Sequence, residues 1–161
     1  LTHYAHGFNS PHGQKHQHPH SGGVIRREFA ERGLEDLYLK QRRWLKANWP
    51  QIIEKHFLDS LLPLKYVSIK EKSLIDIGSG AGFPGVVLAI ANPQAKIVLL
   101  EPNNKKARFL QTVKDNLHLD IVTLVVGRAE TQNTLREEFD FALARAAKQL
   151  NILLDLAIPV L

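Results

Sequence analysis

The sequence predicts an α/β fold built on an open, mostly parallel β-sheet. From residue 73 onward, short apolar runs alternate with helical patterns. A glycine-rich loop directly follows the first apolar run and precedes a helical pattern. Parallel strands that are joined by crossover helices produce this alternation, because each crossover packs a helix onto one face of the sheet.

Each element of this core has its own signal in the sequence. The strands are expected at the apolar runs 74–77, 96–100, 121–126 and 139–143. The helices are expected at residues 85–91, 103–117 and 150–158. In the middle helix, one apolar face is formed at three- and four-residue steps by Ala107, Leu110, Val113 and Leu117. The region 63–161 is therefore predicted to form the core domain.

Residues 24–62 are expected to form an N-terminal helical region, because apolar residues recur there at three- and four-residue steps. Pro50 is expected to start a helix, since proline suits the first turn, and Pro63 is expected to end or bend it. Seven arginines and lysines stand between residues 26 and 46. This basic stretch either contacts RNA or forms an ordinary solvated helix face.

Residues 1–23 hold six of the eight histidines and few apolar residues, which predicts a disordered tail. Metal chelation by this tract is an alternative. The histidines have no fixed spacing, whereas closed metal sites show defined ligand spacing, so no metal site is predicted.

Composition narrows the class of partner. A net charge of +5 and a pI near 9.6 favour an anionic partner such as nucleic acid. The chain has no cysteine, which excludes disulfides, and no apolar run approaches the ~18 residues of a membrane span. We expect a cytoplasmic monomer with no membrane partner. The chain begins with Leu1 and contains no methionine, which indicates a fragment of a longer protein.

The glycine loop is the candidate cofactor site. Glycines at Gly78, Gly80 and Gly82 allow positive φ angles and a close approach of a ligand to the backbone. In open α/β sheets, ligands bind beyond the carboxyl ends of the strands, at the point where the strand order reverses. Gly80, Gly82 and Gly85 also satisfy the dinucleotide pattern G-x-G-x-x-G, and Glu101 lies where that fingerprint places its ribose-binding acid. An NAD(P)-dependent oxidoreductase is therefore one interpretation.

Asp76 favours a different cofactor. It stands two residues before Gly78, and an acid in that position resembles motif I of class I methyltransferases. Their cofactor, S-adenosyl-L-methionine, carries a sulfonium and no pyrophosphate. It has little use for an anion-binding helix N-terminus, and a nearby carboxylate favours its positive charge. Glu101 is interpreted as a ribose ligand, or alternatively as an acid at a helix N-terminus.

Further motifs in the same order resemble the bacterial 16S ribosomal RNA guanine-N7 methyltransferases, also called the glucose-inhibited division protein B family. The matching stretches are K-H-F-L-D-S-L at 55–61, L-I-D-I-G-S-G-A-G-F-P-G at 74–85, K-K-A-R-F-L at 105–110, G-R-A-E at 127–130 and F-D with A-R-A between 139 and 146. Together they run from about residue 55 to residue 161.

The resemblance implies a Rossmann-like class I methyltransferase sheet, which in this chain would lack its C-terminal strands. It implies S-adenosyl-L-methionine as cofactor, N7 of a guanine as methyl acceptor, and 16S ribosomal RNA or the small ribosomal subunit as partner. With the loop residues included, the predicted cofactor site comprises Asp76, Gly78, Gly80, Gly82, Phe83, Glu101, Ala129, Glu130 and Arg145. In it, Ala129 and Glu130 would flank the adenine.

Arg145 is also the predicted catalytic residue, because it follows an apolar strand and should project toward the cofactor edge. An ion pair with Asp76 is the alternative. Guanine N7 carries a lone pair and needs no general base, so Arg145 is expected to hold a phosphate, the base O6 or a carboxylate. The side chains expected to hold the RNA backbone, or else to form a solvated helix face, are Lys105, Lys106 and Arg108. A non-catalytic RNA-binding fragment is the third interpretation.

Overall fold

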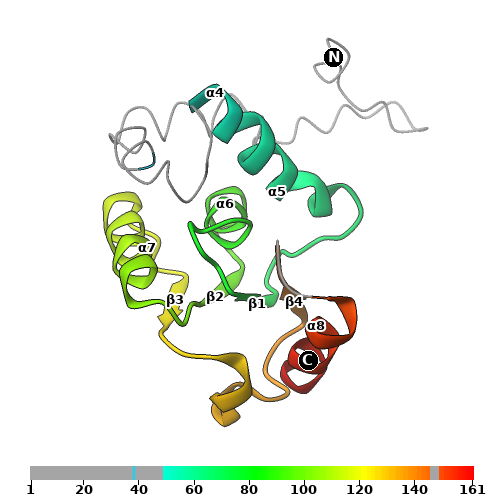
Figure 1. The fold of residues 1–161 in the computed structure, drawn as a ribbon. Helices are drawn as coiled ribbons and strands as arrows, with labels where there is room; N and C mark the ends of the chain where they lie inside the picture. Colours follow the sequence, from blue (N-terminus) through cyan, green and yellow to red (C-terminus); the bar gives the residue numbers. More distant parts are fainter. Residues whose placement is uncertain (1–37, 39–48, 146–148) are drawn as a thin grey trace, which may run out of the picture.

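The computed structural model describes Tyr38, residues 49–145 and residues 149–161 (Figure 1). The predicted tail 1–23, and the helical region before residue 49 apart from Tyr38, lie outside the described residues. In chain order the elements are α4 (Trp49–Ile52), the π-helix η2 (Ile53–Leu58), α5 (Asp59–Leu61), the 3-10 helix η3 (Leu62–Lys65), β1 (Ser73–Ile77), α6 (Gly85–Ala91), β2 (Lys96–Leu100), α7 (Asn104–Leu117), β3 (Val122–Val125), the 3-10 helices η4 (Ala129–Thr131) and η5 (Asn133–Leu135), β4 (Phe141–Leu143), α8 (Leu150–Ala157) and the 3-10 helix η6 (Ile158–Val160).

The four strands form one parallel sheet in the order β3-β2-β1-β4, which confirms the predicted open α/β architecture. In register, Ile75 of β1 lies between Val98 of β2 and Ala142 of β4. The chain steps outward from β1 to β3 and then returns across the sheet to place β4 on the other side of β1. The strand order therefore reverses at the carboxyl ends of β1 and β4, where such sheets bind ligands.

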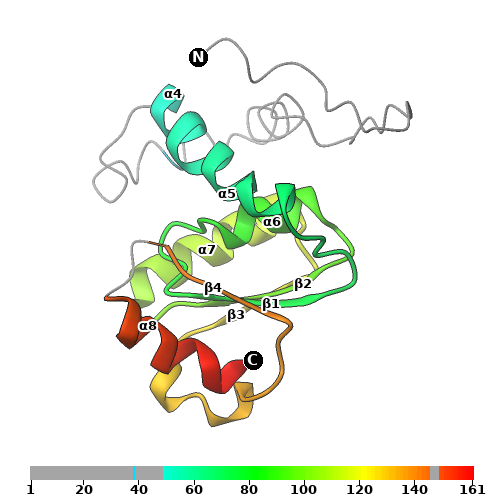
Figure 2. The ribbon, with the colours of Figure 1, turned by 90° about the vertical axis from the view of Figure 1, so that its right-hand side faces the viewer.

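Alternate strand residues face two apolar layers, as the two-residue repeat of a strand requires. Leu74 and Leu99 belong to the larger layer, whereas Ile75 and Leu100 belong to the smaller one, which includes Val160 of η6. Figures 1 and 2 show α6, α7 and the stretch α4–α5 on one side of the sheet and α8 on the other. Helices thus cover both faces, and the carboxyl edge of the sheet stays accessible.

Helix α7 has a well-defined start and end. The Asn103 side chain accepts hydrogen bonds from the backbone N–H groups of Lys105 and Lys106, at 3.0 and 3.2 Å, which satisfies two donors of the first turn. His118 ends the helix in the left-handed conformation with φ +51°. The predicted apolar face is buried: Ala107 is buried, and Leu110, Val113 and Leu117 pack into the larger layer.

The helical stretch 49–65 crosses the same face of the sheet as α6 (Figure 2). The α-helical part of this stretch ends at Leu61, two residues before Pro63, and the chain continues in 3-10 geometry as η3, with Pro63 in its first turn. Phe57 is buried against the ring of Phe83, with 5.0 Å between ring centroids. This contact fixes the stretch directly over the glycine loop.

Among the described residues, no helix combines the length and the apolar character that crossing a membrane requires.

The cap of α7 gives a test of the fold. Replacing Asn103 with alanine removes the acceptor for two first-turn N–H groups, so the free energy of unfolding should fall by about 1 kcal/mol. Urea unfolding followed by far-ultraviolet circular dichroism measures this loss. Asn103→Asp keeps an acceptor at the same position and should retain most of the stability. Equal stabilities for Asn103→Ala and the parent chain would show that the cap contributes nothing.

Candidate functional site

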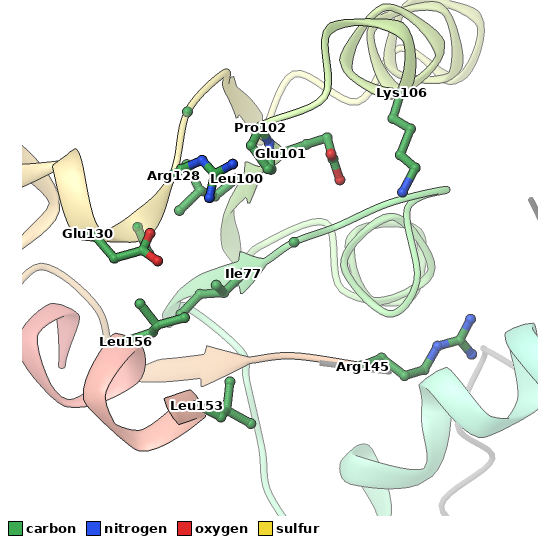
Figure 3. Close-up of a pocket in the computed structure, with 13 residues that line it drawn as sticks. Ile77, Leu100, Glu101, Pro102, Lys106, Arg128, Glu130, Arg145, Leu153 and Leu156 are labelled. Atoms are coloured by element: carbon green, nitrogen blue, oxygen red, sulfur yellow. The ribbon is translucent and has the colours of Figure 1, made fainter. Parts of the chain in front are cut away.

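A cavity of about 430 Å³ opens at the carboxyl edge of the sheet, where the strand order reverses (Figure 3). Gly78 and Glu101, which follow β1 and β2, form part of its wall. Ala129 and Glu130 line it from the turn after β3, and Arg145 lines it from the segment after β4. Each of the four described strands is thus followed by one or two residues that line the cavity.

The glycine loop turns sharply between β1 and α6. Gly78, Gly80 and Gly82 have φ angles of +76°, +60° and +92°, which side-chain-bearing residues rarely adopt. The N–H of Gly78 donates to the carbonyl of Leu100 at 2.8 Å, so the loop begins bonded to the neighbouring strand end. A Cβ on Gly82 would lie 2.6 Å from the side chain of Val86. The third of these glycines therefore serves close packing of the loop on α6.

Glu101 holds the loop from the side of β2. Its carboxylate is 3% exposed, and Oε2 accepts the N–H of Gly80 at 2.8 Å while Oε1 accepts the N–H of Asn103 at 2.8 Å. An ionised carboxylate can accept about four hydrogen bonds, so lone pairs remain for a ligand in the cavity. Glu101 therefore anchors the loop and lines the cavity at the same time.

Asp76 closes the other end of the loop. Its side chain is fully buried, and Oδ2 accepts the N–H of Gly85 at 3.0 Å. A Cβ on Gly85 would lie 2.7 Å from that oxygen and 2.4 Å from the side chain of Leu99, so only glycine fits. The second oxygen, Oδ1, has no hydrogen-bond partner within the described structure. Burial raises the pKa of Asp76 to about 7, although the N–H of Gly85 acts in the opposite direction.

Arg145 reaches from the end of β4 toward the helical stretch (Figure 3). Its Nη2 lies 2.7 Å from Nδ1 of His56, its Nη1 donates to the carbonyl of Lys55 at 3.4 Å, and its guanidinium carbon lies 5.1 Å from the ring centroid of Phe83. Burial lowers the pKa of Arg145, and the charges of Asp59 and Asp76 partly oppose that effect. The expected alternative, an ion pair with Asp76, does not form within 4.0 Å in the described part of the chain.

The predicted site residues fall into two groups. The cavity is lined by Gly78, Glu101, Ala129, Glu130 and Arg145. Behind its wall lie Asp76, Gly80, Gly82 and Phe83, which hold the loop in place. Phe83 is 4% exposed because aromatic side chains from the N-terminal region cover it.

Lys106, which sequence analysis placed on an RNA-binding face, also lines the cavity. Figure 3 shows its side chain extending from α7 toward the glycine loop.

Sequence reasoning missed several lining residues, namely Ile77, Leu100, Pro102, Gly127, Arg128, Leu153 and Leu156. Ile77 and Leu100 end predicted strands, so their position at the carboxyl edge could have been recognised. Leu153 and Leu156 carry no such signal, because they depend on how α8 packs on the sheet. The cavity therefore has an apolar floor beside its acidic and basic groups.

The chain matches the family described as GidB, rRNA small subunit methyltransferase G, over residues 44–161. The chain belongs to this family. The match covers more than the predicted motifs, because it begins eleven residues before Lys55.

Curated relatives agree with this assignment. Ribosomal RNA small subunit methyltransferase G of Mycoplasma capricolum is 44% identical over 110 residues, which cover 68% of this chain and 48% of that protein. The protein of the same name from Fusobacterium nucleatum is 48% identical over 111 residues, with the same two shares. The chain thus spans about half the length of the curated relatives it matches.

Solved structures show the same fold. Precorrin-6y C5,15-methyltransferase from Geobacter metallireducens has a TM-score of 0.52 at 22% identity, covering 62% of this chain and 52% of that one. TYW2 of M. jannaschii, solved in complex with AdoMet, has a TM-score of 0.57 at 15% identity, covering 65% and 47%. At these identities the likeness establishes the architecture alone.

Buried Asp76 gives a test by pH. Its folded-state pKa of about 7 lies above the ~3.9 of an unfolded aspartate, so its contribution to stability is fully present below about pH 4 and is lost as the pH rises toward 7. Asp76→Asn removes this titration. Relative to the parent chain, the variant should gain free energy of unfolding between pH 4 and 7, by at most ~1.4 kcal/mol per pH unit. Urea unfolding at several pH values measures the difference.

Asp140→Asn is the matched control. Hydrogen bonds from Lys72 and Ser73 lower the pKa of Asp140 to about 2, so its contribution changes only at more acidic pH. Its stability difference from the parent should therefore stay constant between pH 5 and 8. If Asp76→Asn also ran parallel to the parent over that range, Asp76 would titrate normally and the interpretation would be wrong.

Proposed function

We propose that this chain is the cofactor-binding part of an S-adenosyl-L-methionine-dependent methyltransferase that methylates N7 of a guanine in 16S ribosomal RNA. Family membership supports the reaction and the substrate class. The observation that carries the proposal is the cavity at the sheet's carboxyl edge, with Glu101 and the glycine loop forming its wall.

The residues present fit this cofactor. Glu101 offers carboxylate lone pairs to the two ribose hydroxyls, and the apolar floor with Ala129 suits the adenine ring. The orphaned Oδ1 of Asp76 lies behind the loop, and a cationic ligand in the cavity would favour the ionised form of this carboxyl. Five of the nine predicted cofactor residues line one cavity, and its size and polarity support the proposal.

The start of α6 argues against a nicotinamide dinucleotide. A dinucleotide site places the pyrophosphate on free N–H groups at the helix N-terminus. Here the N–H of Gly85 donates to Asp76, and the N–H of Val86 donates to the carbonyl of Gly82 at 2.8 Å. These two N–H groups are thus already bonded within the protein and are not free to bind a pyrophosphate. The sequence contains the G-x-G-x-x-G pattern, but the bonded helix start does not favour the pyrophosphate binding that this pattern usually serves.

Methyl transfer to guanine N7 requires alignment and not proton removal. When bound, S-adenosyl-L-methionine supplies the methyl group: the N7 lone pair forms the new C–N bond, the C–S bond breaks with its electrons left on sulfur, and the positive charge passes to the purine. Orientation of the acceptor can contribute ~7–11 kcal/mol in favourable cases. Arg145 stays protonated and donates hydrogen bonds, so it would hold guanine O6 or a phosphate oxygen beside the cavity.

The RNA partner follows from charge and position. The net charge of +5 favours a polyanion, and Lys106 brings a positive charge to the cavity itself. Phosphate contacts of this kind release counterions, so RNA affinity should fall with rising salt. The proposal includes a monomeric protein acting in the cytoplasm, where ribosomal RNA is found.

Cofactor binding can be measured by isothermal titration calorimetry. We expect this chain to bind S-adenosyl-L-methionine and not NADH. Glu101→Ala should weaken binding by roughly 10–100-fold, because it removes hydrogen bonds to a charged acceptor and frees the loop. Glu138→Ala, an exposed change before the opposite end of β4, should bind like the parent. NADH binding without S-adenosyl-L-methionine binding would overturn the methyltransferase assignment.

Methyl acceptance can be tested with labelled cofactor and isolated small ribosomal subunits. The expected product is N7-methylguanosine in 16S RNA, identified by mass spectrometry of the nuclease digest, and its yield should fall as salt rises. Label that appeared only in ribosomal protein would contradict the substrate assignment. RNA binding without cofactor binding would instead support the non-catalytic RNA-binding fragment.

A further inference from the structure

The guanidinium of Arg145 is held by two contacts from the helical stretch 49–65. Nη2 lies 2.7 Å from Nδ1 of His56, and Nη1 donates to the carbonyl of Lys55 at 3.4 Å. These partners stand 89 and 90 residues before Arg145 in the sequence. The stretch that carries them belongs to the region before β1, outside the sheet that builds the cofactor cavity.

The chemistry of the pair determines the state of His56. A guanidinium has five N–H donors and no acceptor, and it stays protonated in proteins. At 2.7 Å from Nη2, Nδ1 of His56 must therefore accept the hydrogen bond through its lone pair. An imidazole whose Nδ1 accepts carries its proton on Nε2 and is neutral. Protonation would place an N–H against an N–H and two positive charges in contact.

Aromatic packing restricts both partners further. The His56 ring stacks on Phe83 with 5.2 Å between centroids and an interplanar angle of 25°, and the guanidinium of Arg145 lies over the same Phe83 ring. Phe83 in turn contacts Phe57 and Tyr38, at centroid distances of 5.0 and 5.4 Å. Because these aromatic rings enclose Phe83, its ring cannot move with Arg145. Phe83 is therefore a fixed support for both Arg145 and His56.

We infer that His56 is a positioning residue: in its neutral form it fixes the guanidinium of Arg145 at the acceptor side of the cavity. This inference rests on the proposed function, because it assigns a role to the side chain that would hold the guanine or its phosphate. The two contacts use two of the five donors, so the remaining N–H groups are available to an acceptor oxygen. The helical stretch therefore completes a site whose other walls come from the sheet.

The charged groups placed near the pair among the described residues come from the helical stretch and from β1. Lys55 and Asp59 stand on the same helical stretch as His56, and Asp76 acts on Arg145 from β1. The glycine loop and α6, residues 77–95, contain no titratable side chain. Burial raises the pKa of the Tyr38 hydroxyl, which keeps it neutral. A proton on Nδ1 of His56 would remove the acceptor that holds Nη2 of Arg145, so the contact requires the neutral ring.

The first experiment reads the tautomer without any reaction. Long-range proton–nitrogen NMR spectra of the whole chain distinguish Nε2–H imidazole from Nδ1–H imidazole and from imidazolium. The signals of His56 among the eight histidines are identified by their loss in His56→Asn. At pH 8 we expect the Nε2–H form. An Nδ1–H signal would overturn the inference, whether or not the protein transfers methyl groups.

The second experiment measures methyl transfer for two complementary variants. His56→Asn keeps an acceptor atom at the place of Nδ1, whereas His56→Phe keeps an aromatic ring for Phe83 but has no acceptor. We expect His56→Phe to lower kcat/KM for RNA by roughly tenfold or more, the size expected when one hydrogen bond to a charged group is lost. His56→Asn should recover most of the loss. Affinity for S-adenosyl-L-methionine should be unchanged in both.

A double-mutant cycle separates positioning from a general structural role. In an Arg145→Ala background, His56→Phe should have no further effect on kcat/KM, because its partner is already gone. Additive losses, or equal losses for His56→Phe and His56→Asn, would overturn the inference. If the parent chain itself transferred no methyl group, the proposed function would be contradicted instead. The NMR result would still decide the protonation state of His56.

Discussion

The contact between the Asp76 carboxylate and the N–H of Gly85 is the constraint on which the rest of the site depends. It closes the loop of seven residues, 78–84, between the end of β1 and the start of α6. The approach leaves no room for a Cβ at position 85, so the acid and the glycine require each other. The contact also engages an N–H of the first turn of α6, which an anion at that helix start would otherwise bind.

Glu101 supplies the second restraint, from the neighbouring strand. It accepts hydrogen bonds from Gly80 in the loop before α6 and from Asn103 at the start of α7. One side chain therefore connects the segments that lead into these two helices. The loop is thus held near its middle by Glu101 and at its α6 end by Asp76, and both acids are almost completely buried. For Asp76, burial carries a desolvation cost that the N–H of Gly85 offsets only in part. A positively charged ligand would offset more of it.

Local signals predicted most of the architecture. Apolar runs and glycines located the strands, the crossover helices and the cavity residues Gly78, Glu101 and Arg145, because strand ends in a parallel sheet meet at one edge. The contact of Arg145 with His56 left no trace in the spacing, since it joins residues 89 positions apart through packing of a separate helical stretch. Phe83 was expected to line the pocket. The same helical stretch packs on it through Phe57, a contact that the sequence spacing does not reveal.

The anchoring of the glycine loop by both Asp76 and Glu101 affects the thermodynamics of ligand binding. Gly78 and Ser79 donate to Leu100, Gly80 donates to Glu101, and Gly82 donates to the carbonyl of Ser79, so the protein's own hydrogen bonds hold the loop in its conformation. Association with such a preorganised surface loses little conformational entropy. The heat capacity change of ligand binding should then reflect desolvation of the apolar floor of the cavity, and not the folding of a flexible loop.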